Sequence, residues 1–411
     1  MSDGIEAALA ATFREEWPRL VAAAMRIAGD LQTAEDAAQD SFLAALDRWA
    51  LAGTPERPGA WLMTVCRNRA RNAIRDAGRA ERKARSLRPL LAQPPADGAR
   101  PEITDDRLRL IAMCCHPLLP TNAQVALTLR MVAGLTTEEI ARGFNTPTPT
   151  IAQRIVRAKR ALADHRVTFA DDDPVLSDRL PAILDVAYLI FNEGYLAAAG
   201  DALTRGDLAL EGYRLSCLLT QLAPGEAAPW ALRALICFQL SRWTTRTGAD
   251  GELLTLDAQD RSRWDRALIT EGAHALSQAR RGSRNQLLLQ AELAACHATA
   301  ATAEATDWAA IVALYDELLA IDDSPVVALN RAVAVAMASG PAAALPLLDD
   351  LAGDRALARS HRIWAVRADL HRRLGHTTAA LDDYTRALEL VRNDVERRYL
   401  TDARARLAAD S

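Results

Sequence analysis

The sequence predicts an all-α fold on three observations. Half of the 411 residues are hydrophobic and a quarter are charged, but only 5% are aromatic. Ala, Leu and Arg dominate, and these residues lead the helix-propensity scale, whereas strands favour β-branched and aromatic side chains. Apolar positions recur at helical spacing from the N-terminus onward, between segments rich in Gly and Pro. A chain of this length is expected to form two or three domains.

Charge is distributed unevenly along the chain, although the net charge is only −4. Residues 55–90 carry +7 and residues 142–166 carry +5. By contrast, residues 1–54 carry −5 and residues 167–411 carry −9. Two short basic blocks in an otherwise acidic chain indicate local binding to a polyanion.

Three helices are expected in the first 80 residues, over 5–30, 30–49 and 60–79. The second is amphipathic: its apolar side holds Ala37, Phe42 and Leu46, and its acidic side is expected to be exposed, with Glu35, Asp36, Gln39 and Asp40. The third carries a predicted buried stripe of Leu62, Cys66, Ala70 and Ile74. Beside or opposite that stripe lies a basic and amide row made of Arg67, Asn68, Arg71, Asn72 and Arg75.

A linker is predicted over 81–102, because five Pro and Gly residues break helical periodicity between 86 and 101. Helices resume near Ile103. Thr136 to Glu139 has the pattern of a capping box, in which Thr136 and Glu139 satisfy each other's backbone N–H groups. After a turn at 145–147, Thr148 is expected to cap a new helix with Pro149 at its first position.

The segment 136–162 is typical of a helix-turn-helix, whose second helix lies in the DNA major groove. Gln153 and Arg154 can make two-pronged hydrogen bonds to adenine and guanine. Arg157, Lys159, Arg160 and Arg166 are better placed for phosphates. The helix 60–79 is a second candidate DNA contact, and Trp61 at its start could either stack on bases or belong to the core.

From about residue 175 onward, the sequence pattern predicts a series of consecutive helices. Tyr315 and Tyr384 lie 69 residues apart and Gly340 and Gly375 lie 35 apart, which suggests two tetratricopeptide-like units, each with an aromatic-led first helix at Trp308 or Trp364. Generic helical packing is the alternative. The expected domains are 1–80, 103–168, 175–290 and, for the tetratricopeptide-like repeats, 291–411.

The order of these parts resembles the sigma-70 family, in its extracytoplasmic-function group. Residues 5–79 resemble region 2, with the matching residues in 30–42 and 58–72. Residues 103–165 resemble region 4, with the matching residues in 135–141 and 150–159. The segment Tyr188-Leu-Ile-Phe-Asn-Glu-Gly-Tyr195 resembles the long helical extension of one subgroup. The expected architecture is therefore two small helical domains that bind DNA and polymerase, followed by a large helical extension.

The resemblance implies a transcription initiation factor rather than an enzyme, with core RNA polymerase and promoter DNA as partners. It assigns core-polymerase binding to Glu35, Asp36, Gln39 and Asp40. It assigns the promoter −10 element to Trp61, Arg67, Asn68, Arg71, Asn72 and Arg75. It assigns the −35 element to Thr148, Thr150, Gln153, Arg154, Arg157 and Lys159. The extension is expected to regulate activity, through contact with regions 2 and 4 or with a separate regulatory protein.

Several function classes lack support in the sequence. No metal or cofactor motif is found, and the six cysteines are expected to be reduced and buried. No signal peptide or membrane span is expected, which predicts a cytoplasmic location without membrane contact. Two alternatives remain: a stand-alone one-component regulator with a helical sensor domain, and a scaffold or enzyme within 175–411, where Glu193 and Asp207 are isolated acids.

Overall fold

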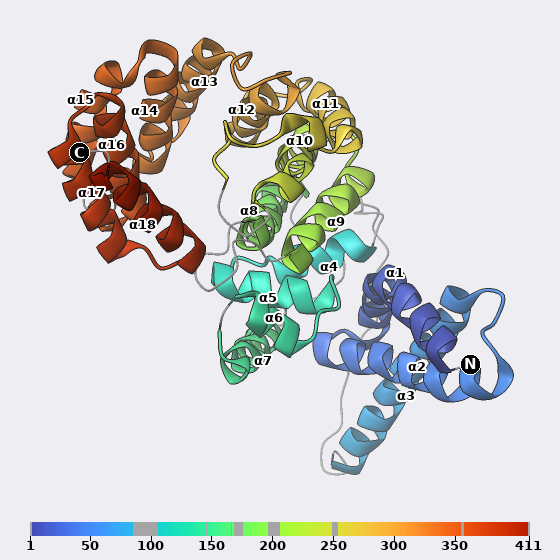
Figure 1. The fold of residues 1–411 in the computed structure, drawn as a ribbon. Helices are drawn as coiled ribbons and strands as arrows, with labels where there is room; N and C mark the ends of the chain where they lie inside the picture. Colours follow the sequence, from blue (N-terminus) through green and yellow to red (C-terminus); the bar gives the residue numbers. More distant parts are fainter. Residues whose placement is uncertain are drawn as a thin grey trace. The chain divides into compact units, whose positions relative to one another are not determined.

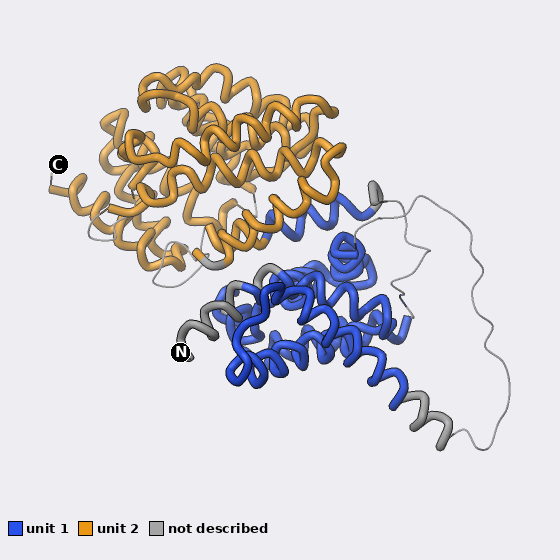
Figure 2. The backbone as a smooth tube through the Cα atoms, turned by 90° about the vertical axis from the view of Figure 1, so that its right-hand side faces the viewer, with its two compact units in different colours: residues 1–189 blue, residues 190–411 orange. Residues whose placement is uncertain are grey.

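The computed structural model of the chain describes residues 2–84, 106–144, 146–165, 167, 176–195, 206–248, 254–354 and 357–409. Within these residues the regular elements are α-helices and three short 3-10 helices. The predicted all-α class is confirmed. The chain divides into two compact units, residues 1–189 and 190–411, which are coloured separately in Figure 2.

The first three helices, α1 (Ser2–Ala28), α2 (Leu31–Ala52) and α3 (Pro58–Ala84), pack against one another as a bundle (Figure 1). We refer to them as the α1–α3 domain. Asp30 caps α2, since its carboxylate accepts a hydrogen bond from the Thr33 amide at 2.8 Å. Large apolar side chains from all three helices fill the centre, among them Trp17, Leu20, Met25, Phe42, Trp49 and Leu62.

The buried stripe of α3 is shorter than predicted. Leu62, Cys66 and Ala70 are each 0% exposed, but Ile74 is 43% exposed. The far end of α3 projects beyond the other two helices (Figure 1), which agrees with the exposure of Ile74. Leu46 of α2, placed on the apolar side by the sequence, is likewise 42% exposed.

Four shorter helices form the α4–α7 domain: α4 (Asp106–Cys114), α5 (Thr121–Met131), α6 (Thr137–Gly143) and α7 (Thr148–Asp164). Most of the predicted linker lies outside the described residues, because residues 81–84 continue α3 and the structure resumes at Asp106. The core of the α4–α7 domain is apolar and includes Leu110, Leu127, Leu129, Ile140, Ile151 and Ile155.

The helix-turn-helix begins with the predicted capping box. The Thr136 hydroxyl accepts from the Glu139 amide at 3.1 Å, and the Glu139 carboxylate accepts from the Thr136 amide at 2.7 Å. The second helix differs in detail from its prediction. It starts at Thr148 with Pro147 as the capping residue and no side-chain cap bond, because Thr148 already has helical backbone and Pro149 falls one position further in.

The second unit begins within α8 (Leu176–Tyr195) and continues through α9 (Gly206–Leu222), α10 (Ala227–Ser241), α11 (Arg266–Ala279) and α12 (Gln286–Thr299). Two 3-10 helices, η1 (Trp243–Thr245) and η2 (Arg261–Arg263), lie between α10 and α11. Gly194 allows α8 and α9 to approach closely: a Cβ at this position would lie 2.1 Å from the backbone nitrogen of Ala209. The glycine of the Tyr188–Tyr195 motif is thus a packing requirement.

Six further helices complete the chain: α13 (Trp308–Ile321), α14 (Pro325–Ser339), α15 (Pro341–Ala352), α16 (His361–Arg373), α17 (Thr377–Leu390) and α18 (Asp394–Ala409), with η3 (Leu357–Arg359) before α16. Each of these α-helices packs against the next in a curved stack (Figure 1). Such consecutive packing is the arrangement of helical repeat proteins.

The predicted repeat landmarks do not all occupy equivalent positions. Gly340 joins α14 to α15 and Gly375 joins α16 to α17, and both have positive φ, 91° and 75°. The pairs α14–α15 and α16–α17 therefore follow the 35-residue spacing. Trp308 lies outside both pairs, at the start of α13, whereas Trp364 lies in α16. An aromatic-led first helix in each unit is therefore not a shared feature.

All six cysteines are free thiols. Cys66, Cys114, Cys115 and Cys237 are buried as predicted, but Cys217 and Cys296 are only partly buried. Burial raises the pKa of Cys66 and of Cys115 to about 12, so these thiols stay protonated and unreactive at neutral pH.

Candidate nucleic-acid interface

The basic and amide row of α3 lies on the surface of the α1–α3 domain. The five side chains predicted to contact the −10 element from this row are all exposed: Arg67, Asn68, Arg71, Asn72 and Arg75. Arg75 donates a hydrogen bond to the Asn72 side-chain oxygen at 2.7 Å. Because Leu62, Cys66 and Ala70 face the core, the opposite side of α3 is free to present this row to a polyanion.

Trp61, at the start of α3, lies between the core of the domain and its surface. Its ring meets that of the buried Trp49 edge to face, with centroids 5.7 Å apart. This contact anchors Trp61 to the core, yet the residue keeps partial exposure. A fixed and partly open indole can support a stacked base.

The second helix predicted to contact DNA, α7, has an exposed polar face like that of α3. Ile151, Ile155, Ala158 and Leu162 are buried on its inner side. On the outer side Thr150, Gln153 and Arg157 are exposed, while Thr148 and Arg154 are half-buried. Apart from Lys159, the side chains predicted to contact the −35 element therefore reach the surface together.

Lys159 does not share this exposed face. Its ammonium group donates to the side-chain oxygen of Gln32 at 3.0 Å and to the carboxylate of Glu35, both on α2. Only 12% of the Lys159 side chain is exposed. The residue predicted to hold a DNA phosphate is paired in this structure with the α1–α3 domain.

The acidic face of α2 is also partly covered. Asp36 and Asp40 are exposed as predicted, and Gln39 is half-buried, but Glu35 is only 4% exposed. The prediction of an exposed Glu35 is wrong because a second domain packs on this side of α2. Besides Lys159, Arg130 of α5 donates its Nε hydrogen to Glu35 at 2.6 Å, and Gln39 donates at 3.1 Å.

Further contacts extend this interface between the α1–α3 and α4–α7 domains. The indole of Trp17 donates a hydrogen bond to the backbone oxygen of Arg130 at 3.2 Å. Gly134 has φ +72°, and a Cβ there would lie 2.7 Å from the Phe13 ring and 3.1 Å from the Trp17 ring. Arg26 of α1 forms an ion pair with Asp106 of α4.

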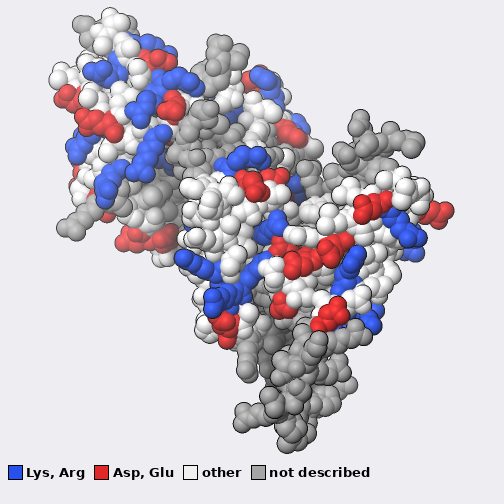
Figure 3. All heavy atoms as spheres, turned by 90° about the horizontal axis from the view of Figure 1, so that it is seen from below, with Lys and Arg blue, Asp and Glu red and all other residues white. Residues whose placement is uncertain are grey.

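The residues of this interface were not among the predicted sites, apart from Glu35, Gln39 and Lys159. Arg130 carries a weak signal in the sequence, since it is the basic residue in the last turn of α5. Arg26, in the last turn of α1, and Asp106, in the first turn of α4, carry a similarly weak signal. Helical periodicity describes each helix separately and does not show that these two residues pair. In the view of Figure 3, a group of acidic side chains near the centre of the visible face lies beside a group of basic ones.

The second unit contains a polar cluster around Glu271 of α11. Tyr213 donates to both carboxylate oxygens, at 2.9 and 3.0 Å, and Arg233 pairs with Glu271 at 3.0 Å. Cys237 donates its thiol hydrogen to the same carboxylate. Burial and the neighbouring Glu271 raise the pKa of Cys237 and of Tyr213, so neither group is an activated nucleophile.

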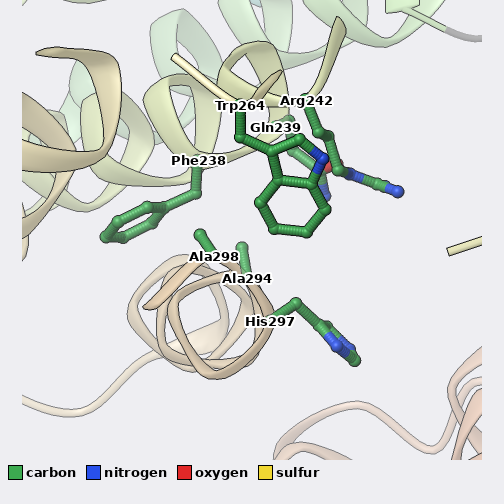
Figure 4. A pocket seen from close by; sticks show the side chains of 7 residues that line it. All are labelled: Phe238, Gln239, Arg242, Trp264, Ala294, His297 and Ala298. Atoms are coloured by element: carbon green, nitrogen blue, oxygen red, sulfur yellow. The ribbon is translucent and has the colours of Figure 1, made fainter. Parts of the chain in front are cut away.

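A small cavity of about 20 Å³ lies between α10, Trp264 and α12, and Figure 4 shows the side chains that line it. This volume suits about one water molecule. Burial, with Arg242 and Arg261 nearby, lowers the pKa of His297 in its wall to about 4. A larger open pocket of about 540 Å³ lies beside the N-terminus of α16, and its lining includes Arg359, His361, Glu389 and Arg392.

Among the residues that the structure describes, His, Cys, Asp and Glu form no group of three that could hold a metal ion. In the same residues, no helix combines the length and the apolar character needed to cross a bilayer.

Three family models match the chain. Sigma-70 region 2 matches residues 12–80 and sigma-70 region 4 matches residues 109–162. Residues 179–280 match a family of unknown function, DUF6596. The first two matches correspond to the α1–α3 and α4–α7 domains, and the third starts in α8.

The chain is similar to known proteins at two levels. It is 37% identical over 404 residues to "uncharacterized protein R00370" of Rhizobium meliloti (strain 1021), which covers 96% of this chain and 94% of that protein. It is 29% identical over 145 residues to the ECF RNA polymerase sigma factor SigL of Mycobacterium tuberculosis, covering 34% of this chain and 77% of that protein.

The second similarity has the length of the two N-terminal domains, whereas the first extends over nearly the whole chain. The matches to both sigma-70 regions, in order and on helices with exposed basic faces, agree with the resemblance found in the sequence. Members of this family act in transcription initiation and are not enzymes. The chain belongs to the extracytoplasmic-function group of the sigma-70 family and carries a large helical C-terminal extension.

Proposed function

We propose that this sigma factor directs core RNA polymerase to a specific set of promoters through two separate DNA contacts. The row on α3 binds the −10 element and its opened strand, and the exposed face of α7 reads the −35 element. The observation that carries this proposal is the presence of two helices whose polar faces are exposed on adjacent domains. Tethering two weak DNA contacts to one polymerase raises their effective concentration at the promoter.

The −35 assignment depends on which α7 side chains can reach base edges. Gln153 and Arg154 lie one to two turns from the helix N-terminus, at the positions that enter the major groove in helix-turn-helix proteins. Arg157 lies one turn further and suits a phosphate contact. Thr148 and Thr150 flank Pro149 at the start of the helix and are proposed as the first contacts.

The −10 assignment combines cations with an aromatic side chain. Arg67, Arg71 and Arg75 would neutralise backbone phosphates, while Asn68 and Asn72 offer both donors and acceptors. Trp61, held by Trp49, would stack against an unpaired base. Stacking on an aromatic ring contributes about 1–3 kcal/mol per base.

Polymerase binding is proposed for the acidic face of α2, with Asp36 and Asp40 as its exposed carboxylates. The C-terminal unit is proposed to regulate activity. Residues 167–411 carry −9, so this part of the chain is repelled by DNA and suits contact with proteins. It would take the regulatory role that a separate anti-sigma factor has elsewhere in the family.

The direct test is in vitro transcription with purified bacterial core polymerase, genomic promoter fragments and this chain, followed by mapping of start sites. We expect start sites that require the chain and share two upstream elements. Absence of chain-dependent start sites, or failure to associate with core polymerase, would contradict the proposal.

The alternative function is a stand-alone one-component regulator that binds DNA through α6 and α7. Such proteins usually dimerise on paired half-sites. Footprinting without polymerase discriminates between the two: a footprint of equal strength with and without polymerase favours the regulator. The match to region 2 favours the sigma factor.

A further inference from the structure

We infer that the free sigma factor holds itself in a closed form, in which Glu35 of the polymerase-binding helix fastens the α4–α7 domain against the α1–α3 domain. This inference rests on the proposed function for the identity of the two surfaces. It adds that each surface masks part of the other until polymerase separates them.

Glu35 is the centre of the closed interface. Its carboxylate is almost fully buried and receives hydrogen bonds from Arg130 and Lys159 of the other domain and from Gln39 of its own helix. A buried carboxylate without a cation costs several kcal/mol. The two cations are therefore the partners that make burial of Glu35 tolerable, and both depend on the α4–α7 domain being in place.

The two cations, Arg130 and Lys159, lie outside the polymerase-binding helix, and Lys159 is part of the proposed DNA contact. Lys159 lies on the DNA-reading helix α7, and Arg130 lies at the end of α5, where it also donates to the backbone oxygen of Leu135 at 3.1 Å. While Lys159 holds Glu35 and Gln32, it cannot contact a phosphate. While Glu35 is covered, it cannot contact polymerase.

Apolar packing supports the ion pairs. Trp17 donates to the Arg130 carbonyl, and Gly134 lies against the rings of Phe13 and Trp17 with no room for a side chain. A second ion pair joins Arg26 of α1 to Asp106 of α4. These contacts come from α1, α4 and the loop after α5, and they join the same two domains as the ion pairs of Glu35 do.

The closed form has a measurable effect on affinity. A protein whose binding-competent form is a minor fraction shows an apparent Kd increased by the inverse of that fraction. If about a tenth of the chains are open, releasing the contact should tighten polymerase binding about 10-fold. Arg130 is the residue to change, since it is not itself proposed to bind polymerase or DNA.

The test measures the distance between the two domains in the full chain. Spin labels are placed on cysteines introduced at two exposed alanines, Ala52 at the end of α2 and Ala163 near the end of α7. The parent chain, treated identically, gives the background from native thiols. We expect one narrow distance distribution for the labelled parent sequence and a longer, broader one for Arg130→Glu.

Two control variants distinguish separation of the two N-terminal domains from a loss of folded structure. Arg142→Glu makes the same charge change on an exposed arginine of α6 and should leave the distance unchanged. Arg26→Glu weakens the interface from the α1–α3 side, without touching the Arg130 bond to Leu135. It should lengthen the distance, and adding Asp106→Arg should restore the original value.

Binding to core polymerase completes the test. We expect polymerase to lengthen the distance in the parent sequence and to bind Arg130→Glu about 10-fold more tightly. An unchanged distance in both Arg130→Glu and Arg26→Glu would overturn the inference, as would polymerase binding that leaves the domains closed. If the chain fails to bind polymerase while Arg130→Glu still opens it, the proposed function fails and the closed contact stands.

Discussion

Arg154 is the side chain on α7 best suited to read a base. Replacing it with Ala should cost about 1–3 kcal/mol of binding at one position of the −35 element. The reason is loss of a two-pronged hydrogen bond, which only guanine accepts in the major groove. Transcription from promoters with single −35 substitutions measures the effect.

The matched control for Arg154 is Arg160→Ala on the same helix, where the side chain is 81% exposed and pairs with Asp164. It should weaken binding evenly across sequences, as a phosphate contact does. A uniform loss for Arg154→Ala as well would make Arg154 a phosphate contact instead.

His297 makes the stability of the C-terminal unit sensitive to pH. Burial beside Arg242 and Arg261 lowers its pKa from 6.5 to about 4, so the folded chain keeps the ring neutral where the unfolded chain protonates it. The stabilisation is complete above pH 6.5 and is lost as the pH falls toward 4. The full loss corresponds to about 3 kcal/mol.

Denaturant unfolding at pH 7 and pH 4.5 measures this dependence. His297→Gln should lose less stability on acidification than the parent chain, because glutamine does not titrate. The control is His274→Gln, an exposed histidine on α11, which should behave as the parent does. Equal acid sensitivity of all three chains would contradict the assignment.

At the scale of elements, the contact between α8 and α9 depends on the absence of one side chain. Gly194→Ala would place a Cβ 2.1 Å from the backbone nitrogen of Ala209, and backbone cannot move aside as a flexible side chain can. We expect a loss of about 1–3 kcal/mol in the unfolding free energy of the C-terminal unit.

Gly225→Ala is the matched control, since a Cβ there meets nothing within 4 Å. Amide hydrogen exchange on the full chain reports both variants. Increased exchange should be confined to α8, α9 and their neighbours in Gly194→Ala, whereas Gly225→Ala should match the parent. Equal protection in the two variants would show that α8 and α9 can separate without cost.

The elements were predictable from the sequence where local chemistry defines them. The capping box at Thr136 and the apolar stripe of α7 follow from hydrogen-bonding rules and from 3.6-residue periodicity, which act within a single helix. Ile74 was placed wrongly because periodicity does not show where a helix leaves its bundle. Glu35 was placed wrongly because a polar face can be buried when another domain supplies its cations.

At the scale of the whole molecule, the boundary between the units bears on how the extension is tested. It falls within α8, between residues 189 and 190. A truncation should therefore keep α8 whole and end after Tyr195, because a cut before residue 176 also removes a helical segment that belongs to the first unit.

If the extension regulates the sigma regions, the chain that ends after Tyr195 should differ from the full chain by about 5-fold or more in promoter-specific transcription. Higher activity would mean that the extension restrains the factor, and lower activity that it licenses it. The measurement is single-round transcription at matched concentrations, with circular dichroism to verify folding. Equal activity of the two chains would remove the regulatory role.

Gly134 has a consequence for how the two N-terminal domains fit. Its left-handed backbone is costly for other residues, and the space beside it is taken by the rings of Phe13 and Trp17. Substitution of Gly134 by a larger residue should therefore push the two N-terminal domains apart. Substitution of Phe13 by a smaller residue should instead leave a cavity between them. The distance between the surface proposed to bind polymerase and the helix proposed to read DNA therefore depends, at this point, on the absence of a side chain at Gly134.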